Sequence, residues 1–380
     1  MPFPRKIRVA HCIETVHLGG VEQTRLTLAK GLQPDRFEQI LICTKALGAL
    51  PDQFREAGCP VKTIGVFRSR VDWQSLARAR RHLREFRPDI VHGGVYEGVI
   101  TAALAGKIAG VPIIIGEETS EPAGRRWSGH LFLRALTTLT DRMIGVSPHV
   151  RDYLVNSLRI PSSKVVLVNN GVIESPSPTR DEVADLRRAL GLRGGSFVIG
   201  TVGRLFDSHK KTSDVIRALP ALLKEMPAAR LLIVGEGPDQ PMLESLATSL
   251  GVSEQVTFAG YQPHTRPFFE LMDIFVHVPA SEAFGLVLVE AMFARKPVVA
   301  SSVGGIPTVV ADGETGVLIP SGDPVRLSRE LLRLAADPER RRAMGEAGFT
   351  KARAEFSQAR YVDDIDRLYT QLVESHGGAR

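Results

Sequence analysis

Residues 274–300 read IFVHVPASEAFGLVLVEAMFARKPVVA, and this stretch decides the fold. A short apolar run, Ile274–His277, leads through a loop into an almost entirely apolar stretch of helical length, and a second apolar run, Pro297–Ala300, follows. Strands that are apolar along their whole length and alternate with helices are typical of parallel sheets covered on both faces. The stretch therefore predicts a strand–helix–strand unit of a parallel α/β sheet.

The same alternation of short apolar runs and helical periodicity extends through the whole chain. A Pro/Ser-rich linker, Ser175–Pro178, divides it into two halves. We therefore predict an α/β protein with two doubly wound, Rossmann-like domains that face a central cleft, where ligands of open α/β sheets bind. The expected strands are Ile7–Ile13, Gln39–Cys43, Ile90–His92, Ile113–Ile115, Met143–Val146 and Val165–Val168 in the first half, and Val198–Val202, Arg230–Val234, Val256–Phe258, Ile274–His277 and Pro297–Ala300 in the second.

The predicted domains cover residues 1–174 and 196–354, and residues 175–195 form the linker and the first helix of the second domain. Residues 355–380 form a final helix and tail. Phe356, Tyr361, Ile365 and Leu368 lie there at helical spacing. We expect this helix to return to the N-terminal domain.

Composition places the chain among ordinary globular proteins. It has 380 residues, of which 43% are hydrophobic and 24% charged, which excludes a disordered chain and a small disulfide-stapled scaffold. The three cysteines (Cys12, Cys43 and Cys59) predict buried thiols in a reducing compartment. A membrane-spanning helix needs about 20 apolar residues in a row, whereas the longest apolar region, residues 98–116, is interrupted by Lys107. We therefore expect a cytoplasmic protein.

The net charge of +6 lies entirely in the first half. Residues 1–185 contain 25 Lys and Arg against 19 Asp and Glu, and the remainder contains 23 of each class. Such an excess indicates either an anionic partner or a solvated basic face. The basic segment Arg68–Arg87 predicts a helix with Trp73, Leu76, Leu83 and Phe86 on its apolar face. Its arginine face is either solvated, the interpretation we favour, or in peripheral contact with an anionic membrane.

The loop Pro122–Leu133 is a second candidate for contact with an acceptor or a membrane. It contains Arg125, Arg126, Trp127 and Phe132, and an ordinary mobile loop is the alternative.

Several residues at predicted strand ends are candidates for ligand binding. Gly19-Gly20 follows the first strand and opens a helix, where the backbone can approach an anion closely. Arg204 and Lys210 follow the first strand of the second domain and could bind a diphosphate. Glu290 lies on an otherwise apolar helix, where a carboxylate needs a partner such as a ligand hydroxyl.

These motifs, in this order, resemble those of the retaining GT-B glycosyltransferases of glycosyltransferase family 4. The resemblance covers nearly the whole chain. Its parts are Gly19-Gly20, Pro88-Asp-Ile-Val-His92, Asp141-Arg-Met-Ile-Gly-Val-Ser147, Asn170-Gly171-Val172, Val202-Gly-Arg-Leu205 with Lys210, Ile233-Val-Gly-Glu-Gly-Pro238, Val256-Thr-Phe-Ala-Gly260, Glu282 with Glu290, Gly304-Gly305-Ile306-Pro307 and Phe356-Ser357.

The resemblance implies an enzyme that moves a sugar from a nucleotide diphosphate sugar, with UDP or GDP, to an acceptor hydroxyl. The acceptor would be a lipid-linked or polysaccharide intermediate of bacterial surface glycan biosynthesis. The enzyme would need no metal, cofactor or protein nucleophile, because fixed cations and amides stabilise the leaving diphosphate. Nucleic acid is not an expected partner.

The resemblance also implies roles for individual residues. Arg204 and Lys210 would hold the diphosphate, Glu290 the ribose and Glu282 the sugar hydroxyls. Gly19 and Gly20 would approach the diphosphate from the other domain. The amides near the start of the helix would lie close to sugar and phosphate. The full set expected at the donor is Gly19, Gly20, Arg204, Lys210, Gly260, Tyr261, Glu282, Ala283, Phe284, Gly285, Leu286 and Glu290.

The chain departs from the family pattern at three places. No His follows the strand Ile113–Ile115, so Glu117 or Glu118 becomes a candidate for the catalytic contacts of that His. Lys211 stands where the family usually has Gly, and Thr308 replaces a common Glu. Two alternatives remain open: a nucleotide-sugar epimerase of the same fold, and a non-catalytic nucleotide-sugar-binding subunit. The one Asp-x-Asp, Asp364-Ile-Asp366, is expected on a solvated helical face.

Overall fold

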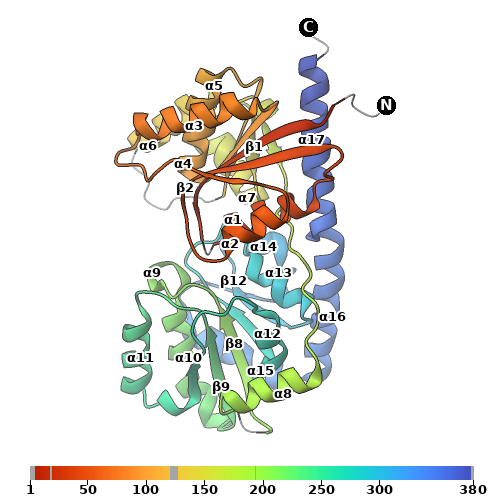
Figure 1. Ribbon diagram of the computed structural model, residues 1–380. Coiled ribbons are helices and arrows are strands. Elements are labelled where there is room, and N and C mark those ends of the chain that lie inside the picture. Colours follow the sequence, from red (N-terminus) through yellow and green to blue (C-terminus); the bar gives the residue numbers. More distant parts are fainter. Residues whose placement is uncertain (1–4, 18, 120–126, 193, 378–380) are drawn as a thin grey trace. The chain divides into compact units, whose positions relative to one another are not determined.

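The computed structural model describes residues 5–17, 19–119, 127–192 and 194–377. The chain forms two compact units, which span Met1–Ile173 with Ser357–Arg380 and Glu174–Phe356. The C-terminal helix α17 (Gln358–Gly377) thus belongs to the first unit (Figure 1), where it packs against α1 (Gly20–Gly31).

The first unit is built on a seven-stranded, wholly parallel sheet with the strand order β3-β2-β1-β4-β5-β6-β7. The order reverses direction between β1 and β4, as in doubly wound folds. The strands are β1 (Ile7–Val16), β2 (Phe37–Ala46), β3 (Val61–Thr63), β4 (Ile90–Gly94), β5 (Ile113–Glu118), β6 (Arg142–Gly145) and β7 (Val165–Leu167).

Helices cover this sheet. Besides α1 and α17 they are α2 (Leu50–Glu56), α3 (Trp73–Phe86), α4 (Val95–Ile100), the π-helical turn Thr101–Ala105, α5 (Gly106–Ala109), α6 (Trp127–Thr137), α7 (Pro148–Asp152), the π-helical turn Tyr153–Ser157 and the 3₁₀ turn Ser162–Lys164.

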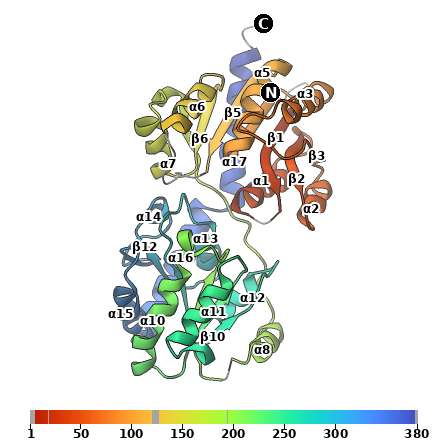
Figure 2. The same cartoon turned by 90° about the vertical axis from the view of Figure 1, so that its left-hand side faces the viewer.

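The second unit has a six-stranded parallel sheet with the order β10-β9-β8-β11-β12-β13. Its strands are β8 (Phe197–Val202), β9 (Ala229–Val234), β10 (Val256–Phe258), β11 (Ile274–His277), β12 (Val298–Ser301) and β13 (Gly316–Ile319). Its helices, most of which Figure 2 labels, are α8 (Arg180–Ala189), α9 (Asp207–Lys210), α10 (Thr212–Glu225), α11 (Gln240–Ser249), the 3₁₀ turn Ser253–Gln255, α12 (Arg266–Leu271), α13 (Leu286–Phe293), α14 (Ile306–Val309), α15 (Pro324–Ala336) and α16 (Pro338–Glu355).

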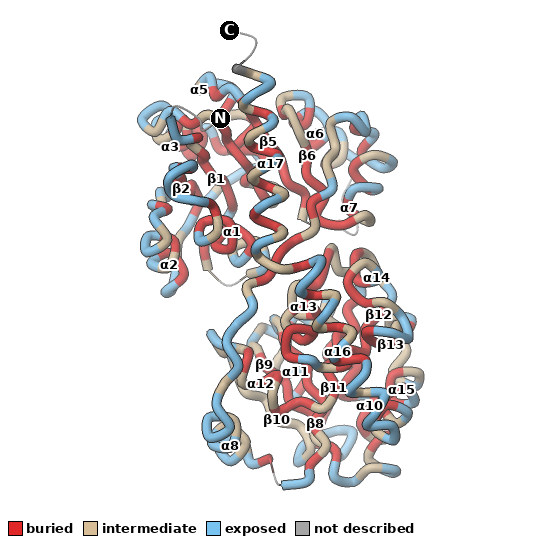
Figure 3. The backbone as a smooth tube through the Cα atoms, turned by 90° about the vertical axis from the view of Figure 1, so that its right-hand side faces the viewer, coloured by how far each residue is buried: buried red, intermediate tan, exposed pale blue. Residues whose placement is uncertain are grey.

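Each sheet lies in the buried centre of its own unit (Figure 3). In the second unit, Ile199, Leu231 and Ile274 of three neighbouring strands are at most 1% exposed. In the first unit, Tyr361 and Ile365 of α17 join the core cluster of the sheet. The predicted two-domain α/β architecture is thus confirmed. The central strands β4, β11 and β12 are buried along their whole length as expected, whereas the edge strands β7 and β10 are only partly buried.

Two short strands were absent from the prediction. β3 contains the polar residues Lys62 and Thr63, and β13 is only four residues long and begins with Gly316. All three cysteines are free and buried. In the part of the chain that the structure describes, no helix has both the length and the apolar character needed to cross a membrane.

Candidate functional site

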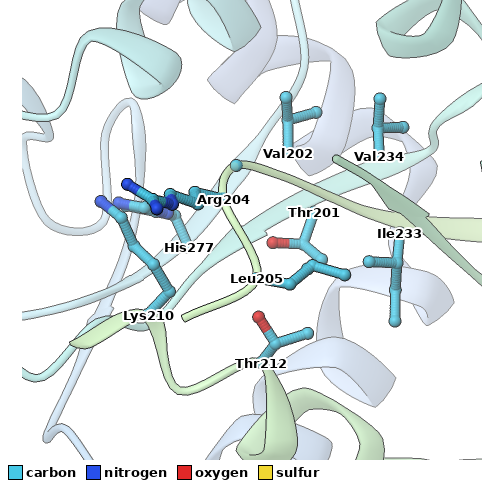
Figure 4. A pocket seen from close by; sticks show the side chains of 10 residues that line it. Thr201, Val202, Arg204, Leu205, Lys210, Thr212, Ile233, Val234 and His277 are labelled. Atoms are coloured by element: carbon cyan, nitrogen blue, oxygen red, sulfur yellow. The ribbon is translucent and has the colours of Figure 1, made fainter. Parts of the chain in front are cut away.

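The candidate site lies where the two central strands of the second unit end. β8 and β11 are parallel neighbours, so their carboxyl ends meet at the same edge of the sheet. Arg204 follows β8, Lys210 ends α9, and His277 ends β11. All three line one small pocket, and Figure 4 shows their nitrogen-bearing ends gathered on one side of it. The structure thus brings together the two cations that the sequence predicts, and it adds a histidine.

Glu282 joins this group through its carboxylate. The Lys210 Nζ lies 2.6 Å from Glu282 Oε2, and the His277 Nε2 lies 3.1 Å from the same oxygen. Burial alone would raise the pKa of Glu282, but the hydrogen bond from His277 and the charge of Lys210 outweigh it and lower the pKa to about 2. Glu282 is therefore an ionised carboxylate at neutral pH.

A pair of glycines fixes the backbone of the Glu282 loop. The Gly305 N–H donates to the Glu282 carbonyl oxygen at 2.8 Å. A Cβ at Gly304 would lie only 2.0 Å from that oxygen, and Gly304 has a φ of +52°. Any larger residue at 304 would therefore displace the loop. On the other side, the Ala280 N–H donates to the His209 carbonyl oxygen at 2.7 Å, which ties the loop to α9.

Glu290 lies on α13, which begins at Leu286 after Gly285 in a left-handed conformation (φ +94°). The Thr265 hydroxyl donates to Glu290 Oε2 at 3.2 Å. Burial raises the pKa of Glu290 from 4.5 to about 7, and this one hydrogen bond opposes the shift. The side chain is thus a buried carboxyl group whose hydrogen bond from Thr265 does not offset the cost of burial.

The other residues expected at the donor, near Glu282 and Glu290, differ in how far their side chains are exposed. The Phe284 ring is 2% exposed and packs edge-on against Phe356, so only its backbone can serve a ligand. Ala283 and Leu286 are half-buried on either side of this loop. Tyr261, after β10, is 42% exposed and follows Gly260, whose carbonyl accepts from the Gly235 N–H at 2.8 Å.

In the first unit, Gly19 and Gly20 lie at the N-terminus of α1. The Glu22 carboxylate packs onto Gly19, where a Cβ would lie 2.3 Å from Glu22 Oε2. Burial raises the pKa of Glu22. Gly19 therefore makes room for a carboxylate of its own helix.

The structure corrects the role expected for Glu117. β5 extends to Glu118, beyond the predicted end at Ile115, and this turns Glu117 into the core, where it is 1% exposed. Its Oε2 lies 3.1 Å from Arg25 Nη2 and 3.2 Å from His92 Nε2. Glu117 is thus one half of a buried ion pair in the core of the first unit, and its carboxylate is taken up by residues of the protein. Glu118, at the end of β5, is also buried, at 6% exposure.

The basic segment also differs from the prediction in one respect. Leu76 and Leu83 of α3 are buried as expected, but Trp73 is 66% exposed at the start of the helix. Trp127 of α6 is 75% exposed. The Arg70 guanidinium lies 5.6 Å from the ring centre of Phe132, which links the segment before α3 to α6. Arg125 and Arg126 lie outside the described residues.

Asp364 and Asp366 are engaged by arginines on the surface of the first unit. Asp364 pairs with Arg360 and Arg367 on α17, and Asp366 pairs with Arg36. Within the described ranges, no group of three or more His, Cys, Asp or Glu side chains is arranged to hold a metal ion.

Comparison with known proteins agrees with these motifs. The family model of glycosyl transferases group 1 matches residues 182–351, and that of glycosyltransferase family 4 matches residues 18–175. A D-inositol 3-phosphate glycosyltransferase of Stackebrandtia nassauensis is 30% identical over 316 residues, which cover 75% of this chain and 69% of that protein. The chain belongs to the group 1 glycosyltransferases of family 4.

Other matches are shorter or more distant. A D-inositol 3-phosphate glycosyltransferase of Segniliparus rotundus is 34% identical over 251 residues, and the match spans 55% of that protein. The chain thus spans little more than half the length of this relative. The crystal structure of HepE from Anabaena in complex with UDP and glucose superposes with a TM-score of 0.86 at 20% identity, covering 96% of this chain and 99% of HepE. This likeness shows a GT-B fold.

Sequence reasoning missed His277. It ends an apolar strand, which gives it the pattern of a core residue, and only the fold shows that its ring reaches Glu282. The sequence did contain one signal that could have identified it. His277 lies at the carboxyl end of a central strand, five residues before the candidate Glu282.

Proposed function

We propose that the protein is a retaining, metal-independent glycosyltransferase that moves a sugar from a nucleotide diphosphate sugar to an acceptor hydroxyl. The observation that carries this proposal is the convergence of Arg204, Lys210 and Glu282 at the carboxyl ends of β8 and β11. Membership of the family supports it. The UDP bound by HepE supports a uridine donor as the first to test.

Arg204 and Lys210 would stabilise the leaving diphosphate. Charge-assisted hydrogen bonds contribute about 1.5–3 kcal/mol each, and they act where negative charge grows as the sugar departs. In the proposed step the bond between the anomeric carbon and the phosphate oxygen breaks. The acceptor oxygen bonds to the same face of that carbon, and the acceptor proton passes to the departing phosphate.

Glu282 and Glu290 would recognise hydroxyl groups of the donor. A carboxylate is acceptor-only and matches hydroxyl donors. Glu282 is ionised and fixed by its loop, which suits it to sugar hydroxyls, whereas the poorly solvated Glu290 would gain ribose hydroxyls as partners. Tyr261, exposed after β10, is a candidate contact for the base.

We also propose an acceptor at a membrane surface, consistent with a lipid-linked intermediate of bacterial surface glycan assembly. Trp73, Trp127 and Leu131 are exposed apolar side chains, and Arg68 and Arg81 of the same region have side chains about two-thirds exposed. Apolar side chains beside cations suit an anionic lipid surface, where each cation contributes about 1 kcal/mol.

Vesicle sedimentation tests the membrane contact. We expect the protein to pellet with vesicles rich in phosphatidylglycerol, less so at high salt, and the Trp73→Ala/Trp127→Ala variant to stay in solution. Val325→Ala, which removes a 67% exposed side chain of the second unit, is the matched control. Wild-type protein that stays in solution at low salt would refute the membrane contact and leave the donor site untouched.

The enzymatic proposal is tested with UDP-, GDP- and ADP-sugars and a membrane extract as acceptor source. We expect one donor to release its nucleoside diphosphate, and Arg204→Ala to weaken that reaction. Formation of a free sugar isomer would instead identify an epimerase. Donor binding without release would identify a binding subunit.

A further inference from the structure

His277 is a buried side chain that the proposed chemistry has not yet used. It ends β11, is 3% exposed, and lies parallel to the Phe275 ring at a centroid distance of 6.3 Å. Its Nε2 lies 3.1 Å from Glu282 Oε2. The strand and the neighbouring ring thus fix the imidazole in direct contact with the carboxylate proposed to bind the sugar.

The protonation state of His277 follows from its surroundings. The groups that face it are the Lys210 ammonium, the Glu282 carboxylate and, in the same pocket, Arg204. Burial lowers the pKa of His277 below 6.5 against the opposing hydrogen bond to Glu282, so the ring is neutral at pH 7. A carboxylate can only accept, so the ring proton lies on Nε2 and is donated to Glu282.

Lys210 and His277 bind the same oxygen of Glu282, which distinguishes their roles. Both contacts go to Oε2, at 2.6 Å from Lys210 and 3.1 Å from His277. Lys210 is also the cation proposed for the donor diphosphate. When its ammonium group turns to phosphate, Glu282 loses a donor in a site where an unpaired carboxylate is unfavourable. His277 cannot move in this way because its short side chain is 3% exposed and its ring packs against Phe275.

We propose that His277 is a positioning residue that holds the Glu282 carboxylate on the donor sugar while Lys210 binds the diphosphate. The proposal rests on the proposed function, because it assigns Glu282 to the sugar. It makes recognition of the sugar, as distinct from the nucleotide, depend on a residue that acts through the Glu282 carboxylate.

The test compares the affinity for UDP-glucose with that for UDP, measured by isothermal titration, in wild-type protein, His277→Leu, His277→Gln and Glu282→Gln. GDP with GDP-mannose and ADP with ADP-glucose are the further pairs. We expect His277→Leu to lower the ratio of sugar-nucleotide to nucleotide affinity about tenfold, a difference of about 1.4 kcal/mol. Affinity for the nucleotide alone should stay within about twofold, a difference of less than about 0.5 kcal/mol, because Glu282 is assigned to the sugar.

His277→Gln supplies an amide N–H in place of the ring N–H and should restore most of the ratio. When Glu282 is already replaced by Gln, the additional His277→Leu substitution should not lower the ratio of sugar-nucleotide to nucleotide affinity any further. Should His277→Leu fail to fold, His277→Asn, which keeps a polar group but is too short to reach Glu282, serves in its place.

An unchanged ratio in His277→Leu or His277→Asn overturns the proposal, as does an equal loss for nucleotide and sugar nucleotide. These results leave the glycosyltransferase assignment standing. If wild-type protein binds no nucleotide of the three pairs, the proposed function itself fails, and the role of His277 fails with it.

Discussion

Replacing Glu290 with Gln should stabilise the unliganded protein at alkaline pH and weaken donor binding at the same time. Burial raises the pKa of Glu290 to about 7 from 4.5, and Thr265 supplies the hydrogen bond that partly compensates. An acid whose pKa is raised on folding binds its proton more tightly in the folded state. The free energy of unfolding therefore falls as the pH rises from 4.5 to 7, and it stays low above 7.

The size of this change in the free energy of unfolding follows from the shift in the pKa of Glu290. A shift from 4.5 to about 7 corresponds, at about 1.36 kcal/mol per pKa unit, to an upper limit of about 3 kcal/mol above pH 8. The amide of the Glu290→Gln variant has no charge to bury. We expect the variant to gain up to about 3 kcal/mol relative to wild type at pH 8, and little or nothing at pH 4.5.

Thermal unfolding at pH 5 and pH 8 measures this difference, and the midpoint should rise by roughly 2–4 °C per kcal/mol. Titration with the preferred nucleotide at pH 8 should show weaker binding, because ribose hydroxyls lose a charged acceptor. Glu225→Gln removes an exposed carboxylate from the end of α10 and is the matched control. If the difference in melting temperature between Glu290→Gln and wild type is the same at pH 5 and at pH 8, burial does not raise the pKa of Glu290 as described.

Four further substitutions test other parts of the structure. Glu282→Ala should abolish transfer, whereas Arg204→Ala should mainly raise the dissociation constant of the donor, as measured by nucleoside diphosphate release and by titration; full turnover by Glu282→Ala would refute its assignment. Glu117→Gln leaves the buried Arg25 charge without its partner and should destabilise the protein by about 3–5 kcal/mol in urea unfolding, whereas a change below about 1 kcal/mol would contradict the ion pair. Lys211→Gly relieves a left-handed φ of +52° and should raise the free energy of unfolding, measured in urea, by about 0.5–1 kcal/mol, whereas a variant less stable than wild type would contradict the strain at this position.

The architecture could be predicted from the sequence because its strands are apolar along their whole length. Val198–Val202 and Ile274–His277 are parallel neighbours within one residue of their predicted bounds. The backbone at Lys211 also agrees with the family pattern. The family usually has Gly at this position, and Lys211 has the left-handed conformation that favours Gly. β3 was missed because Lys62 and Thr63 interrupt the apolar pattern at the edge of the sheet.

The site was predictable only in part, because the spacing of residues along the sequence does not show which residues far apart in the chain come into contact in the fold. Lys210 and Glu282 lie 72 positions apart, and their ion pair depends on the adjacency of β8 and β11. Glu117 was misassigned because β5 continues past its apolar run, and the Arg25 that neutralises it comes from α1. Trp73 fits the apolar periodicity of α3 but lies in its first turn, beyond the sheet that buries Leu76.

The most direct test of a nucleotide diphosphate site at Arg204 and Lys210 is isothermal titration of UDP, GDP and ADP into wild-type protein and the Arg204→Ala/Lys210→Ala variant. Each cation should contribute about 1.5–3 kcal/mol, so the variant should bind the preferred nucleotide at least about a hundredfold more weakly. Equal binding by both proteins, or no binding by wild type, would contradict the assignment of this site.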